Sequence, residues 1–142
     1  MLTITNAGSA LETKRFAEEF AESLKPGDVV ALFGQLGSGK TTFVQGLSKG
    51  LGVNKFVTSP SFVIINEYPL PGGSKGSSFY HIDLYRLENE EEIRDLGIEE
   101  ICAADSIVAI EWADKAPHLL PEGCKKIRFE LVSENERKIT VE

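Results

Sequence analysis

A glycine-rich stretch, GQLGSGKTT at residues 34–42, has the residue types and spacing that bind phosphate groups. Its first eight residues fit the pattern Gly-x4-Gly-Lys-Thr. Gly34, Gly37 and Gly39 allow backbone angles that other residues resist, so successive N–H groups can point at phosphate oxygens. The stretch therefore predicts a phosphate-binding loop.

Two side chains at the end of this loop indicate a nucleotide with a metal ion. Lys40 can reach the terminal phosphates, and the Thr41 hydroxyl can ligate Mg²⁺ that bridges the same phosphates. We therefore expect Lys40 to be catalytic and Thr41 to be a metal ligand. The residues that we assign to phosphate binding are Gly34, Leu36, Gly37, Ser38, Gly39, Lys40, Thr41 and Thr42.

A carboxylate follows the apolar run IVAI and belongs to the stretch SIVAIEW at 106–112. Ligands of open α/β sheets bind beyond the carboxyl ends of the strands, which is where Glu111 falls. A carboxylate there can hold Mg²⁺ directly or through water, or orient an attacking water molecule. We favour these roles for Glu111 over that of a solvated charge at a strand end.

The stretch HIDLYR carries a second group of polar side chains. Strand alternation puts His81, Asp83 and Tyr85 on one face. His81 and Asp83 together can position a metal or polarise water, but a solvent-facing strand surface explains the spacing equally well. Trp112 can stack on a base or anchor a partner, although a lone Trp is more often part of a core.

The surrounding elements support the phosphate loop. Four-residue spacing of phenylalanines after Ser9 and Glu12 predicts an amphipathic helix, and VVALF at 29–33 predicts a strand buried on both faces. The stretch TTFVQGLSKGLG predicts the helix after the loop. The loop therefore has the strand before it and the helix after it that a phosphate site requires.

The remaining segments mix parallel-type units with hairpins. Strands are expected at 62–68 and 79–87, joined by the loop-like 69–78, followed by short helices in ENEEEIRDLG and IEEICA and a strand at 106–112. KIRFELVS and RKITVE predict a C-terminal antiparallel pair. We therefore expect an α/β fold, with residues 1–142 forming a single three-layer P-loop NTPase-like domain around a mixed β-sheet.

Composition limits the possible partners. The net charge of −7 makes unaided nucleic-acid binding a poor expectation, because phosphate contacts dominate that affinity. No apolar run reaches the length of a membrane helix, and no export signal is visible. Cys102 and Cys124 lack a His or Cys neighbour at metal spacing, so we expect reduced thiols and a cytoplasmic protein.

Taken in order, GQLGSGKTTF, TSPSF, HIDLYR, LGIEEI and IEW resemble the TsaE family, small bacterial ATPases required for making threonylcarbamoyladenosine in tRNA. The resemblance covers nearly the whole chain. It implies that the nucleotide is ATP, and that Mg²⁺ is held by Thr41 and Glu111 with Asp83 close by and needed for turnover. It also implies a complex with TsaB-like and TsaD-like subunits, with tRNA reached only through that complex.

The resemblance extends to three further segments. TSPSF, at 58–62, can sense the γ-phosphate through Thr58 or Ser59, although a plain turn explains this loop equally well. TSPSF and HIDLYR also look like the two switch segments of the family. Thr13 matches a threonine near the adenine, and Arg137 falls in the C-terminal region that closes over the nucleotide. Two positions depart from the family, Gln35 in place of an acidic residue and Ser61 in place of Thr. We expect Gln35 to permit ATP binding but to alter turnover.

Two other functions share the phosphate loop. A small-molecule kinase usually has a lid with several arginines, whereas the five arginines here are scattered along the chain. A GTPase-type switch generally uses Asn-Lys-x-Asp for guanine, and NKFV at 54–57 lacks the Asp. Both functions therefore stand as alternatives to the ATPase.

Overall fold

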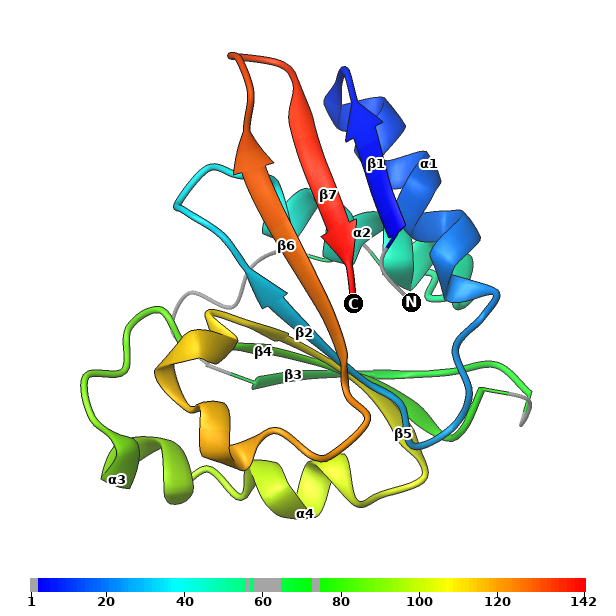
Figure 1. Cartoon of the computed structure of the whole chain (residues 1–142). Coiled ribbons are helices and arrows are strands. Elements are labelled where there is room, and N and C mark those ends of the chain that lie inside the picture. The colour runs from blue at the N-terminus through cyan, green and yellow to red at the C-terminus, as the bar shows by residue number, and fades with distance from the viewer. Residues whose placement is uncertain (1–2, 56, 58–64, 73–74) are drawn as a thin grey trace.

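The computed structural model describes residues 3–55, 57, 65–72 and 75–142. Within these residues the strands form one seven-stranded sheet in the order β1-β7-β6-β2-β5-β4-β3 (Figure 1). The strands are β1 Thr3–Ala7, β2 Val29–Phe33, β3 Ile65–Pro69, β4 Ser78–Asp83, β5 Ser106–Glu111, β6 Lys125–Leu131 and β7 Arg137–Val141. Strands β6, β2, β5 and β4 are parallel, and the outer pairings are antiparallel, so the expected mixed sheet is confirmed.

Helices cover both faces of the sheet. They are α1 Ala10–Ala21, α2 Lys40–Gly50, α3 Glu90–Arg94 and α4 Ile98–Cys102, with 3₁₀ turns η1 Ala113–Lys115 and η2 Pro117–Leu119. Side chains of α1 and α2 join one buried apolar cluster, and those of α3, α4, η1 and η2 join another. The three-layer α/β architecture predicted from the sequence is therefore confirmed.

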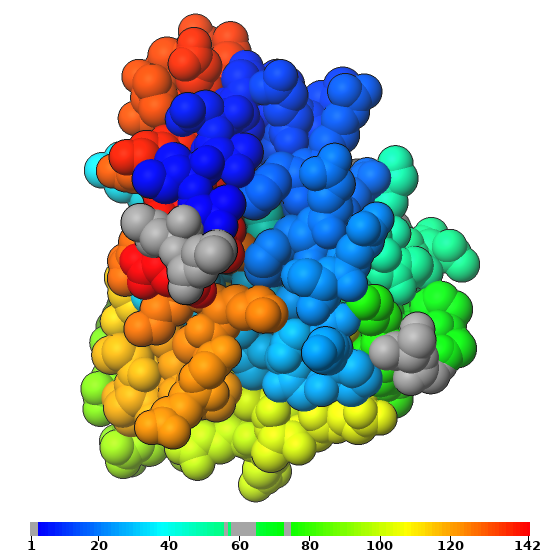
Figure 2. Space-filling view, turned by 45° about the vertical axis from the view of Figure 1, so that its right-hand side comes forward, coloured from blue at the N-terminus to red at the C-terminus, as the bar shows by residue number. Residues whose placement is uncertain are grey.

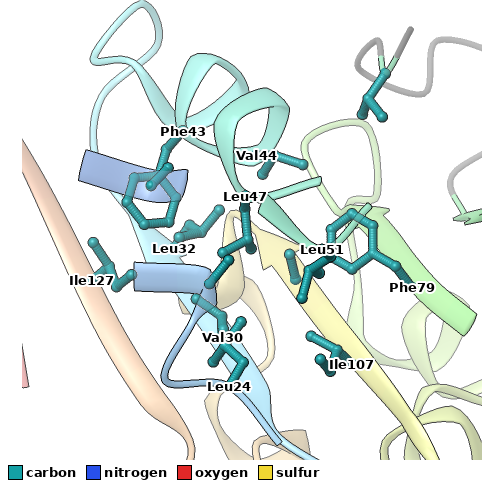
Figure 3. Close-up of a cluster of buried hydrophobic side chains, with 14 of the residues drawn as sticks. Leu24, Val30, Leu32, Phe43, Val44, Leu47, Leu51, Phe79, Ile107 and Ile127 are labelled. Carbon is teal, nitrogen blue, oxygen red and sulfur yellow. The ribbon is translucent and has the colours of Figure 1, made fainter. Parts of the chain in front are cut away.

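Strand β2 shows why its sequence is continuously apolar. Val30 and Leu32 pack into the cluster beneath α1 and α2, together with Phe43 of α2 (Figure 3). Val29 and Ala31 point to the opposite cluster. Because both faces of this strand are buried, alternation of apolar and polar residues is absent, as it is in β5.

Helices α1 and α2 approach closely because α2 presents glycines to α1. A Cβ atom at Gly46 would lie 2.8 Å from the Lys14 Cα and 2.9 Å from the Ala17 Cβ. A Cβ atom at Gly50 would lie 2.7 Å from the Ala21 Cβ. These distances are shorter than van der Waals contact, so side chains at either position would force the helices apart.

The strand predicted at 79–87 is too long, because β4 ends at Asp83. The Asp83 Oδ1 accepts a hydrogen bond from the Tyr85 N–H at 3.0 Å, which turns the chain away from the ladder. Tyr85 therefore does not continue the alternating face of His81 and Asp83. Of the strand predicted at 62–68, positions 62–64 lie outside the described residues, and the rest is found in β3.

The prediction missed the first strand, β1. It is an edge strand that pairs only with β7, and four of its five residues are exposed or half-buried. Such a strand lacks the apolar alternation by which the others were recognised. Figure 2 shows the blue N-terminal segment lying against the orange and red C-terminal hairpin on the surface.

The parallel strands place their carboxyl ends at one edge of the sheet. The glycine loop leaves β2 there, β4 ends there in Asp83, and β5 ends there in Glu111. Arg137 begins β7 at the same edge, because β7 runs antiparallel to β6. This edge therefore gathers residues from four separate parts of the chain.

Candidate nucleotide site

The loop between β2 and α2 requires glycine at its first and last positions. A Cβ atom at Gly34 would lie 2.5 Å from the Ser38 Oγ and 3.0 Å from the Phe129 carbonyl oxygen. Gly39 is the N-cap of α2 and has φ of 105°, in the left-handed region that favours glycine. The loop can therefore pass close to the sheet and open directly onto the N-terminus of an 11-residue helix.

Lys40 is almost fully buried, and its ammonium group lies among loop atoms. The Nζ donates to the carbonyl oxygens of Gly34 and Gln35, at 3.2 Å in the second case, and lies 3.6 Å from the centre of the Trp112 ring. Burial lowers the pKa of Lys40 from its usual value, and nearby carboxylates, Glu111 first, act in the opposite direction. The loop carbonyls and these carboxylates are the groups that favour the charged form of the Lys40 ammonium.

Thr41, Glu111 and His81 form a polar chain in which Glu111 and His81 are buried and Thr41 is half-buried. The Thr41 hydroxyl donates to the two Glu111 carboxylate oxygens, at 3.0 and 3.2 Å. The His81 Nε2 lies 2.5 Å from Glu111 Oε2, and the His81 side chain is 0% exposed. A solvent-facing strand surface is therefore wrong as an interpretation of His81.

Asp83 lies beside this chain. It pairs in register with Glu111 across the parallel strands β4 and β5, so two carboxylates end adjacent strands. Tyr85, which follows the turn after Asp83, packs its ring on Trp112 with 5.1 Å between the ring centres. Trp112 has φ of 59°, which is uncommon for a residue other than glycine and ends β5 immediately after Glu111.

Arg137 connects the C-terminal hairpin to the glycine loop. Its Nη2 donates to the Gly37 carbonyl oxygen at 3.2 Å, and its Nη1 donates to three carbonyl oxygens of the β6–β7 turn. Thr13 of α1 is buried nearby and lines a cavity of about 100 Å³ together with Arg137 and Thr42. The hairpin, the loop and the first helix therefore meet at one place.

A larger cavity, of about 280 Å³, lies over the loop. Its lining residues are Leu36, Gly37, Gly39, Lys40, Thr41, Thr42, Asp83, Tyr85, Glu111, Trp112 and Arg137. The structure therefore brings together most of the residues that the sequence singled out. Gly34 and Ser38 are in the loop but line neither cavity, Thr13 lines only the smaller one, and Thr58, Ser59 and Ser61 lie outside the described residues.

The sequence left the roles of His81 and Trp112 open and gave Tyr85 none, so none of the three was among the assigned site residues. Trp112 packs partly against a core cluster, as a lone Trp often does, and also lines the cavity; stacking on a base or anchoring a partner stays a prediction. Each of the three is within two residues of a carboxylate already singled out, and this proximity in sequence could have identified them as candidates. The contact between His81 and Glu111 needed the strand order, because 30 positions separate them in the sequence.

Comparison with known proteins agrees with this arrangement. Residues 7–139 match the family model described as threonylcarbamoyl adenosine biosynthesis protein TsaE. The tRNA threonylcarbamoyladenosine biosynthesis protein TsaE of Bacillus subtilis is 42% identical over 132 residues, covering 91% of this chain and 78% of that protein. The protein of the same name from Treponema pallidum is 35% identical, covering 94% of this chain and 95% of that one.

A solved structure has the same fold. The crystal structure of Bacillus subtilis YdiB superposes with a TM-score of 0.78 at 33% sequence identity, over 99% of this chain and 84% of that chain. The family model spans the glycine loop, both strand-end carboxylates and Arg137. The chain therefore belongs to the TsaE family.

Proposed function

We propose that this chain is a Mg²⁺-dependent ATPase that acts in the synthesis of threonylcarbamoyladenosine in tRNA, within a complex that contains TsaB-like and TsaD-like subunits. The pathway follows from the names of its relatives. The observation that carries the chemistry is the convergence of Lys40, Thr41 and Glu111 on one cavity above the glycine loop.

The loop fits a chain of phosphates. Gly37 and Gly39 line the cavity without side chains, and Gly39 opens α2 with left-handed backbone angles, so the loop presents bare backbone there. The N-terminus of α2 adds partial positive charge. Bound phosphate oxygens can replace the loop carbonyls as partners of the Lys40 ammonium group. Lys40 then stabilises the negative charge that develops on the transferred group.

The site also fits Mg²⁺. This ion prefers oxygen ligands and usually keeps waters and substrate phosphates in its coordination shell alongside one or two protein groups. Thr41 and Glu111 present a hydroxyl and a carboxylate within 3.2 Å of each other, at the mouth of the phosphate loop. When bound there, Mg²⁺ neutralises charge on the phosphates. To Asp83, which pairs in register with Glu111, we assign the holding of a further water and the orientation of the one that attacks.

The adenine base and the protein partners make up the rest of the proposal. The smaller cavity, which Thr13 lines, adjoins the larger one through the shared residues Gly39, Thr42 and Arg137, and we assign it to the base. The charge of −7 fits a subunit that reaches tRNA through its partners. The chain is expected to act in the cytoplasm, and among its described helices none is apolar and long enough for a membrane span.

Phosphate release from ATP tests the proposed function. The purified chain should hydrolyse Mg²⁺-ATP slowly, and faster once TsaB-like and TsaD-like subunits and tRNA are added. An identical rate with and without these partners would contradict a role in the complex. Calorimetry with GTP in place of ATP separates the GTPase alternative, and transfer of labelled phosphate to a metabolite would favour the kinase.

Replacement of Glu111 tests the metal assignment. Glu111→Gln should reduce Mg²⁺-dependent hydrolysis by at least about tenfold, because the amide is a weaker metal ligand, while nucleotide binding in EDTA persists. Glu122→Gln, which changes an exposed carboxylate outside the nucleotide cavity, is the matched control. Normal hydrolysis by Glu111→Gln would show that Glu111 does not hold the metal.

A further inference from the structure

We infer that His81 is a positioning residue that holds the Glu111 carboxylate in the orientation needed for Mg²⁺, an inference that rests on the proposed function. His81 does not line the nucleotide cavity and so touches neither phosphate nor metal. It acts through Glu111, whose Oε2 lies 2.5 Å from the His81 Nε2.

The hydrogen-bond pattern gives this contact its role. The Thr41 hydroxyl reaches both Glu111 oxygens from one side, and His81 reaches Oε2 from the interior of the sheet. An ionised carboxylate only accepts hydrogen bonds, so the proton of this contact sits on His81 Nε2. If Thr41 and Glu111 held a metal ion, the bond from His81 would fix the Glu111 carboxylate independently of Thr41.

The burial of His81 supports the same conclusion. The side chain is fully buried, and within the described part of the chain its Nδ1 has no hydrogen-bond partner. An apolar side chain of similar size would avoid this unsatisfied nitrogen, so stability alone does not explain an imidazole here. The compensating interaction is the one with Glu111. Metal-binding side chains are commonly oriented by such outer hydrogen bonds.

The test compares nucleotide affinity in Mg²⁺ and in EDTA, measured by calorimetry with the non-hydrolysable adenylyl-imidodiphosphate. The ratio of the two affinities reports the coupling between metal and nucleotide. In His81→Leu this ratio should fall by about tenfold to 100-fold, while the affinity in EDTA stays unchanged. His81→Gln, whose amide places a donor near the original Nε2, should restore most of the ratio.

The other histidine provides the control. His118 is half exposed and lies 3.5 Å from Glu90, outside the residues that line the nucleotide cavity, so His118→Leu should leave the ratio at its parent value. An unchanged ratio in His81→Leu, or an equal loss of affinity in EDTA and in Mg²⁺, overturns the inference while the proposed function stands. If the unmodified chain binds nucleotide equally well in Mg²⁺ and in EDTA, the metal-dependent function is contradicted. The inference about His81 is then contradicted as well.

A spectroscopic measurement covers the case in which His81→Leu does not fold. In the parent, labelled with ¹⁵N-histidine, the His81 Nε2–H proton should be protected from exchange and shifted far downfield by its short bond to a carboxylate. Glu111→Gln should move this resonance upfield, and the His118 resonances should not change. Absence of a protected His81 Nε2–H signal, or its indifference to Glu111→Gln, overturns the inference.

Discussion

The Lys40 ammonium group lies between the backbone of the glycine loop and the ring of Trp112. Its Nζ contacts two loop carbonyls and the face of Trp112, and the ring of Tyr85 packs on the same indole. Carbonyl dipoles and an aromatic face both stabilise a cation. A phosphate that enters the cavity competes with these neutral partners and has the advantage of full negative charge.

Lys40→Ala should therefore weaken nucleotide binding strongly. A hydrogen bond to a charged group contributes about 1.5–3 kcal/mol, so affinity for Mg²⁺-ATP should fall by roughly tenfold to 100-fold or more. Calorimetry measures this directly. Lys49→Ala, which removes an exposed lysine of the same helix, should bind as the parent does. Equal loss in both variants would point to a general effect on α2 rather than to the phosphates.

The Cys102 thiol makes the free energy of unfolding depend on pH, independently of any nucleotide. Burial raises the pKa of the Cys102 thiol from 9.0 to about 11, with smaller contributions from Cys124 and Glu99. Between these two values the folded chain keeps the thiol proton and the unfolded chain loses it. The unfolded state then binds fewer protons, so this group lowers the free energy of unfolding as pH rises through the interval.

Cys102→Ala should reduce that decline. Urea unfolding at several pH values between 9.0 and about 11 compares the slopes of the two proteins. The slope of the free energy of unfolding against pH is the quantity to compare. Loss of the sulfur atom changes the free energy itself at every pH, so the absolute values do not isolate the effect of the thiol proton. Identical slopes would show that the thiol is not shielded from water in the folded chain. Alkylation of Cys102 should likewise be slow below pH 9.0, since the thiolate is the reactive form.

At the scale of elements, the contact between α1 and α2 connects packing to the proposed base site. Gly46 and Gly50 bring α2 against Lys14, Ala17 and Ala21 of α1. The helix α1 also carries Thr13, which lines the smaller cavity. The separation of these two helices therefore determines the size of the proposed adenine pocket.

Gly46→Ala should both destabilise the fold and weaken nucleotide binding. The added methyl group must displace the α1 backbone, since it would lie 2.8 Å from the Lys14 Cα, and overpacking of this kind costs about 1–3 kcal/mol. Thermal unfolding measures the first effect, and ATP affinity well below the melting temperature measures the second. Lys49→Ala is again the control on α2. A destabilised variant with unchanged affinity would show that α1 does not shape the base pocket.

Elements also show what the sequence could predict. The loop, β2 and α2 were predictable because glycines, a continuous apolar run and helical spacing are local signals. The end of β4 was not predictable. The side chain of Asp83 accepts a hydrogen bond from the backbone two positions ahead, and the apolar–polar alternation contains no sign of this turn. Strand β1 lacks a buried face of its own. His81 could be singled out by type, but its contact depends on β4 lying beside β5.

At the scale of the whole molecule, Arg137 links the C-terminal hairpin to the glycine loop of the site. It begins β7, whose partners are β6 and β1, and its guanidinium group reaches the glycine loop after β2. The C-terminal hairpin is thereby held over the cavity above the glycine loop. Because these hydrogen bonds are exposed to water, each contributes little to global stability, but together they set the position of the hairpin.

Arg137→Gln should therefore weaken ATP binding by several-fold to about tenfold and change the free energy of unfolding by less than about 1.5 kcal/mol. Calorimetry and chemical denaturation measure the two effects. Arg128→Gln removes a guanidinium group that pairs with Glu142 and lies over Phe33, outside the residues lining the nucleotide cavity, and serves as the control. A large loss of stability without loss of affinity would show that Arg137 serves the hairpin alone.

The six buried residues of β5 have a consequence for recognising distant relatives. Successive side chains of this strand alternate between the two faces of the sheet, and Trp112 ends it in a left-handed conformation that prevents its extension. Insertion or deletion of one residue within β5 would rotate the Glu111 position to the opposite face. The distance in sequence from Asp105 to the acidic residue is thus constrained as tightly as the acidic residue itself. Alignments that tolerate a gap here would group chains whose carboxylate cannot reach a nucleotide.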